Sequence, residues 1–386
     1  MTFGHNSGKA GGKTKRSMRG TTMLAIRTTL MAMLLVAACD GNPLDGGAPP
    51  NTGGGAVDPG TGGGITTPGG LPPGTTSPTP ATSVTRFEPK GTATVDGDSG
   101  NGYVRDVSYD PVADTFKVDN LAFDGNNVFA RSAQIGSLGP YAVYDGKPSI
   151  PDSFTGSPID QLDHHAIYGV KNGPDGKPQV QFAIVRTGAY VDYGFGGFVY
   201  SRTGGVDLPR EGVGLGSDPE NPAYRGQAHY EGTTAGLRDF LSRGGLEYAT
   251  GNLTVDIDFD DFNDGNGVKG FVTNRRVYDS SGNDITQTII DALTEKSGAN
   301  QTELPVLAFK IGPGVMNDNG EIAGLIGSTY TTDGGNLETF ETGKYYALVS
   351  GANAGTIVGV LVVQGDDPRF TGVTTRETDG FILERK

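Results

Sequence analysis

The sequence predicts an all-β protein in which a secretion signal and a disordered linker precede two folded domains. Glycine accounts for 64 of the 386 residues, and tryptophan is absent. Short runs of alternating or β-branched residues recur between Gly, Asn and Asp turns, whereas long helical patterns are few. About 300 residues follow the linker, which is enough for one large or two modest domains.

The first 38 residues have the composition of a secretory signal. The apolar stretch from Thr28 to Ala38 follows six basic residues and precedes the first acidic residue, Asp40. A run of about 11 residues suits a signal peptide and is too short for a spanning helix, which needs about 20. Small residues followed by Cys39, the only cysteine, resemble the lipobox of bacterial lipoproteins. This resemblance implies signal cleavage after Ala38 and fatty acylation, such as palmitate, on the Cys39 sulfur.

Residues 39–83 predict a disordered linker between this anchor and the folded head. The segment consists almost entirely of Gly, Pro, Thr, Asn and Asp, as in Gly62-Gly63-Gly64 and Ser77-Pro78-Thr79-Pro80. Such a segment has too little apolar surface to offset the entropy lost on ordering. A flexible chain of about 43 residues spans roughly 35–40 Å. We therefore expect a tether that holds the head away from a membrane.

The charge of the mature chain limits its partners. Removing residues 1–38 leaves 24 basic and 44 acidic residues, a net charge of −20. Nucleic acids and anionic lipid headgroups attract clusters of Lys and Arg, so we expect neither as a partner. We expect a monomer that meets a membrane only through the lipid on Cys39.

The segment 84–212 predicts a small β-rich domain. Short strand-like runs are separated by turns at Asp110-Pro111 and at Asp124-Gly125-Asn126-Asn127. A stronger pair of runs follows at Val180–Arg186 and Ala189–Tyr200. One short helix is expected near Pro158–Asp163. The Gly/Pro-rich, acidic stretch Gly204–Asn221 then predicts a domain boundary.

The segment 222–386 predicts an eight-stranded, up-and-down antiparallel barrel. Leu253, Val255, Ile257 and Phe259 alternate with polar residues, which is the period of a strand with one solvated face. Asp284 is placed to cap a short helix with an apolar side, and Thr233–Arg243 is a second candidate helix. Closing the sheet into a barrel removes its exposed edges. Further strands are expected at Tyr224–Tyr230, Gly270–Tyr278, Leu304–Ile311, Gly320–Thr331, Lys344–Ser350, Thr356–Gln364 and Gly372–Leu383.

Residues 222–386 resemble the barrel of transferrin-binding protein B-like lipoproteins. The residues that carry the resemblance are Tyr224-Arg225-Gly226, Leu253–Phe259 followed by Gly270, and the late hairpin Gly343–Val360. In that hairpin Ala354 and Gly359 fit the family pattern, whereas Gly355-Thr356 replaces its acidic stretch. The resemblance implies that residues 84–212 are a handle-like domain before the barrel. It also implies a surface lipoprotein that binds a solute or protein partner, in some relatives for iron or haem acquisition, through loops whose residues cannot be carried over.

Several motifs imitate catalytic or metal sites without completing one. Gly97-Asp98-Ser99-Gly100 is similar to a serine-protease nucleophile loop, but the only earlier histidine, His5, lies in the signal. His164 and His165 are adjacent, so on a strand they point in opposite directions. His229 lies on the first barrel strand and faces either the lumen or water.

An acidic cluster at the end of one strand invites a calcium interpretation, because hard cations prefer oxygen ligands. With Gly265 at the sixth loop position, however, Phe262 stands where an oxygen ligand is required. A solvated strand face is the favoured interpretation. We predict no catalytic residue, no metal ligand and no cofactor. The cluster consists of Asp256, Asp258, Asp260, Asp261, Asn263 and Asp264.

Two functions remain open from the sequence. The first is a non-catalytic, lipid-anchored envelope protein that binds a solute or protein partner through its head. The second is a structural or adhesive surface lipoprotein without a small-molecule site. A packed lumen favours the second, and a lined cavity or an exposed apolar cap favours the first. We expect the outer membrane and surface exposure, although Asp40 after the anchor leaves inner-membrane retention or the periplasmic face open.

Overall fold

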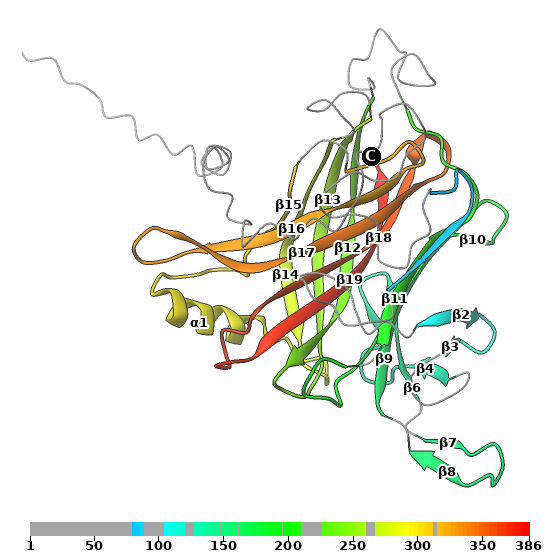
Figure 1. The fold of residues 1–386 in the computed structure, drawn as a ribbon, viewed down its shortest axis with the longest axis horizontal. Helices are drawn as coiled ribbons and strands as arrows, with labels where there is room; N and C mark the ends of the chain where they lie inside the picture. The colour runs from blue at the N-terminus through cyan, green and yellow to red at the C-terminus, as the bar shows by residue number, and fades with distance from the viewer. Residues whose placement is uncertain are drawn as a thin grey trace, which may run out of the picture. The chain divides into compact units, whose positions relative to one another are not determined.

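The computed structural model describes residues 79–88, 104–119, 127–146, 149–160, 162–194, 196–209, 226–259, 267–311 and 315–386. The predicted signal peptide, Cys39 and the linker up to residue 78 lie outside these residues, as does Gly97-Asp98-Ser99-Gly100. Two bodies of β-structure make up the described chain (Figure 1). No helix among the described residues is long and apolar enough to cross a membrane.

The first body, residues 79–209, is called the handle domain below, and it contains a nine-stranded sheet in the order β1-β11-β10-β9-β6-β4-β3-β2, with β5 paired to β6. A separate two-stranded ribbon is formed by β7 and β8. The predicted strong pair of strands is present as β10 and β11, which are antiparallel. The strands are β1 (Val84–Phe87), β2 (Arg105–Asp110), β3 (Thr115–Asp119), β4 (Asn127–Arg131), β5 (Ser137–Leu138), β6 (Tyr141–Gly146), β7 (Ser149–Pro151), β8 (Pro158–Asp160), β9 (His164–Asn172), β10 (Pro178–Thr187) and β11 (Gly196–Arg202).

The second body is a closed barrel of eight antiparallel strands, β12 to β19 in sequence order, which confirms the predicted fold class. Pairing of β12 with β19 closes it, so that the barrel leaves no open edge. The strands are β12 (Gln227–Leu241), β13 (Glu247–Asp258), β14 (Gly267–Tyr278), β15 (Leu307–Phe309), β16 (Glu321–Thr331), β17 (Leu337–Ser350), β18 (Thr356–Asp366) and β19 (Thr374–Arg385).

One α-helix, α1 (Thr286–Ser297), connects β14 to β15 as predicted. Asp284 supports its start, because its Oδ1 accepts the Thr286 backbone N–H at 2.8 Å. Gly298 ends the helix in the left-handed conformation, with φ of 71°. The apolar side of the helix, which includes Ile289 and Ile290, packs against Val277 of β14.

The two other predicted helices are wrong. Thr233–Arg243 falls mostly within strand β12, and Pro158 begins strand β8. Strand β12 lacks clear polar alternation because both of its faces are covered: Leu237 packs against the handle domain and Arg238 points into the barrel. Pro158 pairs with Pro151 in a two-stranded ribbon, where a missing N–H is tolerated.

The barrel lumen is filled by side chains. One end is apolar, with Tyr345 stacked on Phe309 at 3.8 Å between ring centroids. In the same region the buried Tyr230 hydroxyl donates to the Ala354 carbonyl at 2.6 Å. The alternation of Leu253, Val255 and Ile257 places them in this core, as the sequence predicts. This end is therefore an ordinary hydrophobic core.

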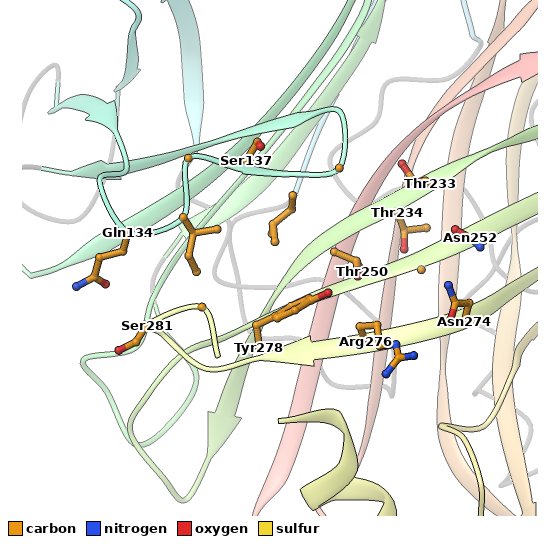
Figure 2. A pocket seen from close by; sticks show the side chains of 16 residues that line it. Gln134, Ser137, Thr233, Thr234, Thr250, Asn252, Asn274, Arg276, Tyr278 and Ser281 are labelled. Carbon is orange, nitrogen blue, oxygen red and sulfur yellow. The ribbon is translucent and has the colours of Figure 1, made fainter. Parts of the chain in front are cut away.

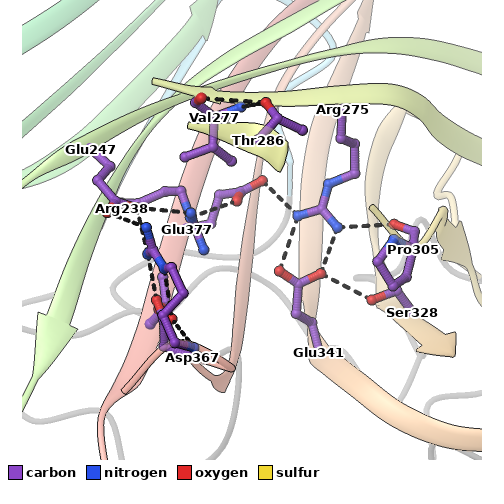
Figure 3. A network of polar contacts seen from close by, with 12 residues as sticks. Arg238, Glu247, Arg275, Val277, Thr286, Pro305, Ser328, Glu341, Asp367 and Glu377 are labelled. Atoms are coloured by element: carbon purple, nitrogen blue, oxygen red, sulfur yellow. Dashed lines mark hydrogen bonds and ion pairs between the residues drawn. The ribbon is translucent and has the colours of Figure 1, made fainter. Parts of the chain in front are cut away.

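The other end of the lumen holds a buried network of charges (Figure 3). Arg275 contacts both oxygens of Glu341, at 2.7 and 3.0 Å, and one oxygen of Glu377 at 3.0 Å. Arg238 bridges Glu247 at 2.9 Å and Glu377 at 3.2 Å. Burying a charge costs desolvation free energy unless the charge is paired. These contacts pair the charges and so allow ionic side chains to fill this end of the barrel.

The handle domain packs on the outer wall of the barrel, where β10 contacts β12, β18 and β19. A shared apolar cluster joins Phe182 and Ile184 of the handle to Val358 and Val360 of the barrel. Residues 79–83, assigned to the linker from sequence, also reach this junction. Thr79 is buried, and its hydroxyl donates to Glu321.

Tyr141 ties the handle domain directly to the barrel ladder. Its hydroxyl donates to the Thr233 carbonyl at 2.9 Å and accepts the Ile382 N–H at 2.8 Å. Thr233 and Ile382 are partners in the β12–β19 pairing that closes the barrel. Burial raises the pKa of Tyr141 to about 12, so the hydroxyl stays protonated at neutral pH and keeps both roles.

Candidate functional site: a polar groove between handle and barrel

A groove of about 750 Å³ runs between the handle domain and the outer wall of the barrel (Figure 2). One side is the handle segment 134–139, which includes β5. The other side consists of residues of β12, β13 and β14, most of them at outer positions, and the turn that follows β14. On that side the lining residues are Thr233, Thr234, Thr250, Gly251, Asn252, Asn274, Arg276, Tyr278, Ser281 and Gly282.

A β-bulge in β14 shapes the barrel side of the groove. Thr250 pairs with Arg276 but Asn252 pairs with Thr273, so Asn274 and Arg275 together oppose Gly251. Asn274 takes the extra position with φ of 50°, a left-handed conformation that asparagine tolerates better than most residues. The bulge resets the alternation of the strand. Arg275 consequently enters the lumen network and Arg276 faces out toward the groove.

The groove also depends on a close approach at Gly251. A Cβ atom there would lie 2.5 Å from Val272 Cγ1, a distance that forces a shift in the barrel core. Glycine therefore lets β13 and β14 keep their spacing at the bulge. The groove wall is built on paired strands rather than on a long loop, so its polar side chains are held on a rigid base.

The lining is polar and almost uncharged. Among the described residues of the lining, the Thr233 Oγ1 is buried, so it is not open to a ligand. Within the same part of the chain, no hydrogen bond engages the side-chain amides of Gln134, Asn252 and Asn274. Arg276 is the one cation in the lining of this groove, and its Nη1 lies 3.7 Å from Asp284 Oδ2. The groove thus offers unused donors and acceptors with little net charge.

The adjacent histidines His164 and His165 lie in the handle domain, outside the lining of this groove. Burial lowers the pKa of His164, whose Nδ1 donates to the Leu162 carbonyl at 2.8 Å. His165 Nδ1 lies 2.8 Å from Asp145 Oδ1 and 3.0 Å from the Tyr248 hydroxyl. Both contacts use one ring nitrogen, whereas a catalytic triad uses both nitrogens of its histidine. His165 therefore joins the handle domain to β13.

His229 lies on the outer face of β12, so of the two orientations left open by the sequence, toward the lumen or toward water, it adopts the second. Its Nδ1 is 2.6 Å from Asp256 Oδ1, and its Nε2 is 3.3 Å from Glu231 Oε1. The hydrogen bond to Asp256 is the main cause of the raised pKa of His229. Residues 260–266 of the acidic cluster lie outside the described residues. Within the described ranges, no group of three or more His, Cys, Asp or Glu side chains is placed to hold a metal ion.

Two handle turns expose apolar side chains at their tips. Phe154, in the turn between β7 and β8, is 96% exposed, and Val112, between β2 and β3, is 95% exposed. The Phe154 turn is ordered by Asp152, whose Oδ1 accepts the backbone N–H groups of Phe154 and Thr155 at 2.9 and 2.7 Å. Single exposed apolar residues are common on protein surfaces, so these tips rank below the groove as a candidate site.

No family model matches the sequence, and no curated protein sequence matches it. Among solved structures, a double mutant of the vaccine antigen Transferrin Binding Protein B from Haemophilus parasuis Hp5 is similar in fold. The match has a TM-score of 0.31 and 11% identity, and it covers 74% of this chain and 45% of that chain.

Two further structures give comparable values. A single mutant of the same Haemophilus parasuis protein has a TM-score of 0.27 and 9% identity, with 72% of this chain and 65% of that chain covered. An intact Transferrin Binding Protein B with N and C lobes has a TM-score of 0.26 and 9% identity, with 74% and 63% covered. The chain spans less than two thirds of each of these proteins. They are distantly similar in fold, and what they bind is not thereby assigned to this chain.

Sequence reasoning missed the groove for a physical reason. Its two walls are more than 90 residues apart in the chain, and no local sequence pattern predicts that they lie side by side. The weak signal that was present is the run Thr273-Asn274-Arg275-Arg276, which interrupts the alternation of β14. Such an interruption in a strand is typical of a bulge, and bulges are frequent beside functional sites.

Proposed function

We propose that this chain is a non-catalytic, lipid-anchored envelope protein that binds a solute or protein partner in the groove between handle and barrel. The observation that carries the proposal is the groove itself, about 750 Å³ in volume and lined by unused polar groups. Binding sites for small ligands are usually preformed concave sites of about 300–1,000 Å³, and this groove matches them in volume, although its lining is more polar than theirs.

The anchor is the second part of the proposal. Cleavage after Ala38 and acylation of Cys39 would place the linker between a membrane and residue 79, the first residue of the described head. We propose the outer membrane, with the head at the cell surface. Retention at the inner membrane or on the periplasmic face is the competing location, because Asp40 follows the anchor.

A binding role without catalysis agrees with how the described histidines are used. His164 bonds to the Leu162 carbonyl within the handle domain, and His165 contacts Tyr248 of the barrel. His229 is paired with two carboxylates on an exposed strand. Acid–base catalysis requires a titratable group within reach of a substrate proton. Among the described residues, the groove lining contains no His, Asp, Glu, Lys or Cys, and its one side chain of a type used in acid–base catalysis is Tyr278.

The alternative function is a structural or adhesive surface lipoprotein. It is favoured by the packed barrel lumen, in which Tyr230, Tyr345 and Arg275 are buried. The groove lies outside the lumen, however, so a filled barrel is compatible with ligand binding. The exposed Phe154 tip is the feature that an adhesive role would use.

Fractionation and affinity capture test both parts of the proposal. Wild-type protein should incorporate labelled palmitate and fractionate with membranes, and Cys39→Ser should do neither. Wild-type protein in the membrane should capture a partner or solute from medium or envelope extract, in iron-rich or iron-poor growth. Asn252→Trp, which fills the groove from an exposed position, should lose that capture, whereas Asn300→Trp, on an exposed turn outside the groove, should retain it. Equal capture by both variants would contradict the proposal.

A further inference from the structure

We propose that the groove binds a neutral, hydroxyl-rich glycan. This inference rests on the proposed binding function and names the chemical class of its ligand. Three independent features of the lining select that class: its charge, its hydrogen-bonding groups and its aromatic platform.

The charge of the lining argues against ionic ligands. Among the described residues that line the groove, none is a carboxylate, although the chain contains 44 acidic residues. A cationic ligand would therefore lack a counter-charge inside the groove. Arg276 is half-exposed and shares its charge with Asp284 at 3.7 Å, so the lining does not provide the cluster of cations that a polyanion requires.

The hydrogen-bonding groups match sugar hydroxyls. Gln134, Asn252 and Asn274 each carry an amide with two donor hydrogens and an acceptor oxygen. A sugar hydroxyl both donates and accepts, so adjacent hydroxyls can pair with one amide from both sides. Neutral groups of this kind form such bonds without the desolvation cost of a charge.

Tyr278 supplies a flat surface in the groove. Figure 2 shows its ring lying along the groove between Ser281 and Arg276. The residue is half-buried and packs against the apolar cluster shared by handle and barrel, so its position is fixed before any ligand arrives. A pyranose ring presents a face of C–H groups, and such faces stack on aromatic rings, whose π faces carry partial negative charge.

A protein partner fits this lining less well. Protein interfaces rely on buried aromatic or aliphatic anchors that enter apolar pockets. The aliphatic lining residues Ile135 and Leu138 are themselves buried in the shared cluster. The surface left to a ligand is therefore mainly amides, hydroxyls and the Tyr278 ring, which favours a polyol over a peptide side chain.

Calorimetric titration of the complete mature protein tests the inference. The probes are maltotetraose and chitotetraose as neutral glycans, oligogalacturonate as an acidic one, and the neutral fractions of soluble glycan fragments prepared separately from cell wall and from lipopolysaccharide. At least one neutral glycan should bind, with an affinity that changes little with salt. Asn252→Ala should weaken that binding by about tenfold, which corresponds to losing one or two hydrogen bonds. Asn300→Ala, the matched control, should leave it unchanged.

The different probes distinguish the possible sources of the glycan. Together with the capture experiment, they also distinguish failure of the glycan inference from failure of the proposed binding function. Binding of cell-wall fragments alone, or of lipopolysaccharide glycan alone, identifies the source within the proposed class. Binding of oligogalacturonate alone, abolished by Arg276→Ala or by salt, overturns the inference. So does binding of no glycan at all. If no glycan binds while groove-dependent capture of a partner persists, the binding function stands and only the glycan class is refuted.

Discussion

Arg86 of the handle domain and Glu321 of the barrel form a two-pronged ion pair across the junction of the two bodies. Arg86 Nε lies 2.6 Å from Glu321 Oε1, and Arg86 Nη2 lies 2.5 Å from Glu321 Oε2. Both side chains are buried, at 5% and 0% exposure. The pair joins β1 to β16, and Thr79 adds a further hydrogen bond to the same carboxylate. A groove formed between the handle domain and the barrel needs such a fixed junction.

Breaking this pair should destabilise the protein strongly. Arg86→Ala leaves the Glu321 carboxylate buried without its cation, and such a change costs about 3–5 kcal/mol. Chemical denaturation measures the loss. Arg131→Ala is the matched control, because the Arg131–Asp114 pair is about 40% exposed and should contribute less than about 1 kcal/mol. Equal losses in the two variants would show that the Arg86–Glu321 pair is not the junction described here.

The contact between Phe182 and Gly380 should be similarly intolerant. A Cβ atom on Gly380 of β19 would lie 2.1 Å from Phe182 Cε2, so Gly380→Ala forces the handle domain away from the barrel. We expect a loss of about 1–3 kcal/mol in the free energy of unfolding. Adding Phe182→Leu should recover part of it, because the two positions touch. Gly334→Ala, whose nearest atom is 3.4 Å away, is the control. A full loss that Phe182→Leu does not relieve would contradict the packing described.

The buried carboxyls of the lumen predict a pH dependence. Burial and the nearby charge of Glu377 raise the pKa of Asp379 well above its ordinary value. Burial alone would also raise the pKa of Glu377, but the charges of Arg275 and Arg238 hold it below its ordinary value. The protonated Asp379 therefore stabilises the folded state fully below the ordinary pKa of an aspartate. This contribution is lost as pH rises through the raised pKa.

Asp379→Asn tests this sign, because asparagine is neutral at every pH. Between the ordinary pKa of an aspartate and the raised pKa of Asp379, the wild-type protein should lose stability relative to the variant as pH rises. The loss should be up to about 1.4 kcal/mol per pH unit. Urea unfolding of both proteins over a series of pH values gives the difference. A relative gain of wild-type stability with rising pH would mean that Asp379 is ionised in the folded protein.

The exposed Phe154 separates the two candidate surfaces. Its side chain is 96% exposed, so Phe154→Ser should change stability by less than about 0.5 kcal/mol. If ligands bind in the groove, the same variant should capture them as well as the wild-type protein does in a pull-down. Loss of capture in Phe154→Ser, with Asn252→Trp unaffected, would place binding on the handle ribbon and favour the adhesive role.

Much of the barrel could be predicted because its strands carry a local signal. Leu253, Val255 and Ile257 face the lumen and alternate with solvated residues, and α1 follows its apolar face and Asp284. The second half of β12 could not be predicted, since the handle domain covers its outer face and the charge network covers its inner face. The sequence of this half therefore lacks the alternation of apolar and polar residues on which a strand prediction depends.

The buried charges and the candidate site could not be predicted from the sequence, for a related reason. Arg86, Arg186 and Arg376 read locally as solvated residues, yet each is buried against a carboxylate supplied by a distant segment. Likewise, Gln134 and Asn252 lie on opposite sides of the groove only because the handle domain docks on β12 to β14. Docking of this kind has no signature in either segment alone.

The central claim is that ligands bind in the groove between handle and barrel, and hydrogen exchange of the captured complex tests it most directly. Backbone amides of the complete mature protein are compared with and without the material recovered in the capture experiment. The account predicts added protection in residues 134–139 and 274–282, the groove segments, and none in the Phe154 turn. Protection confined to residues 151–158, with groove amides unchanged, would contradict it.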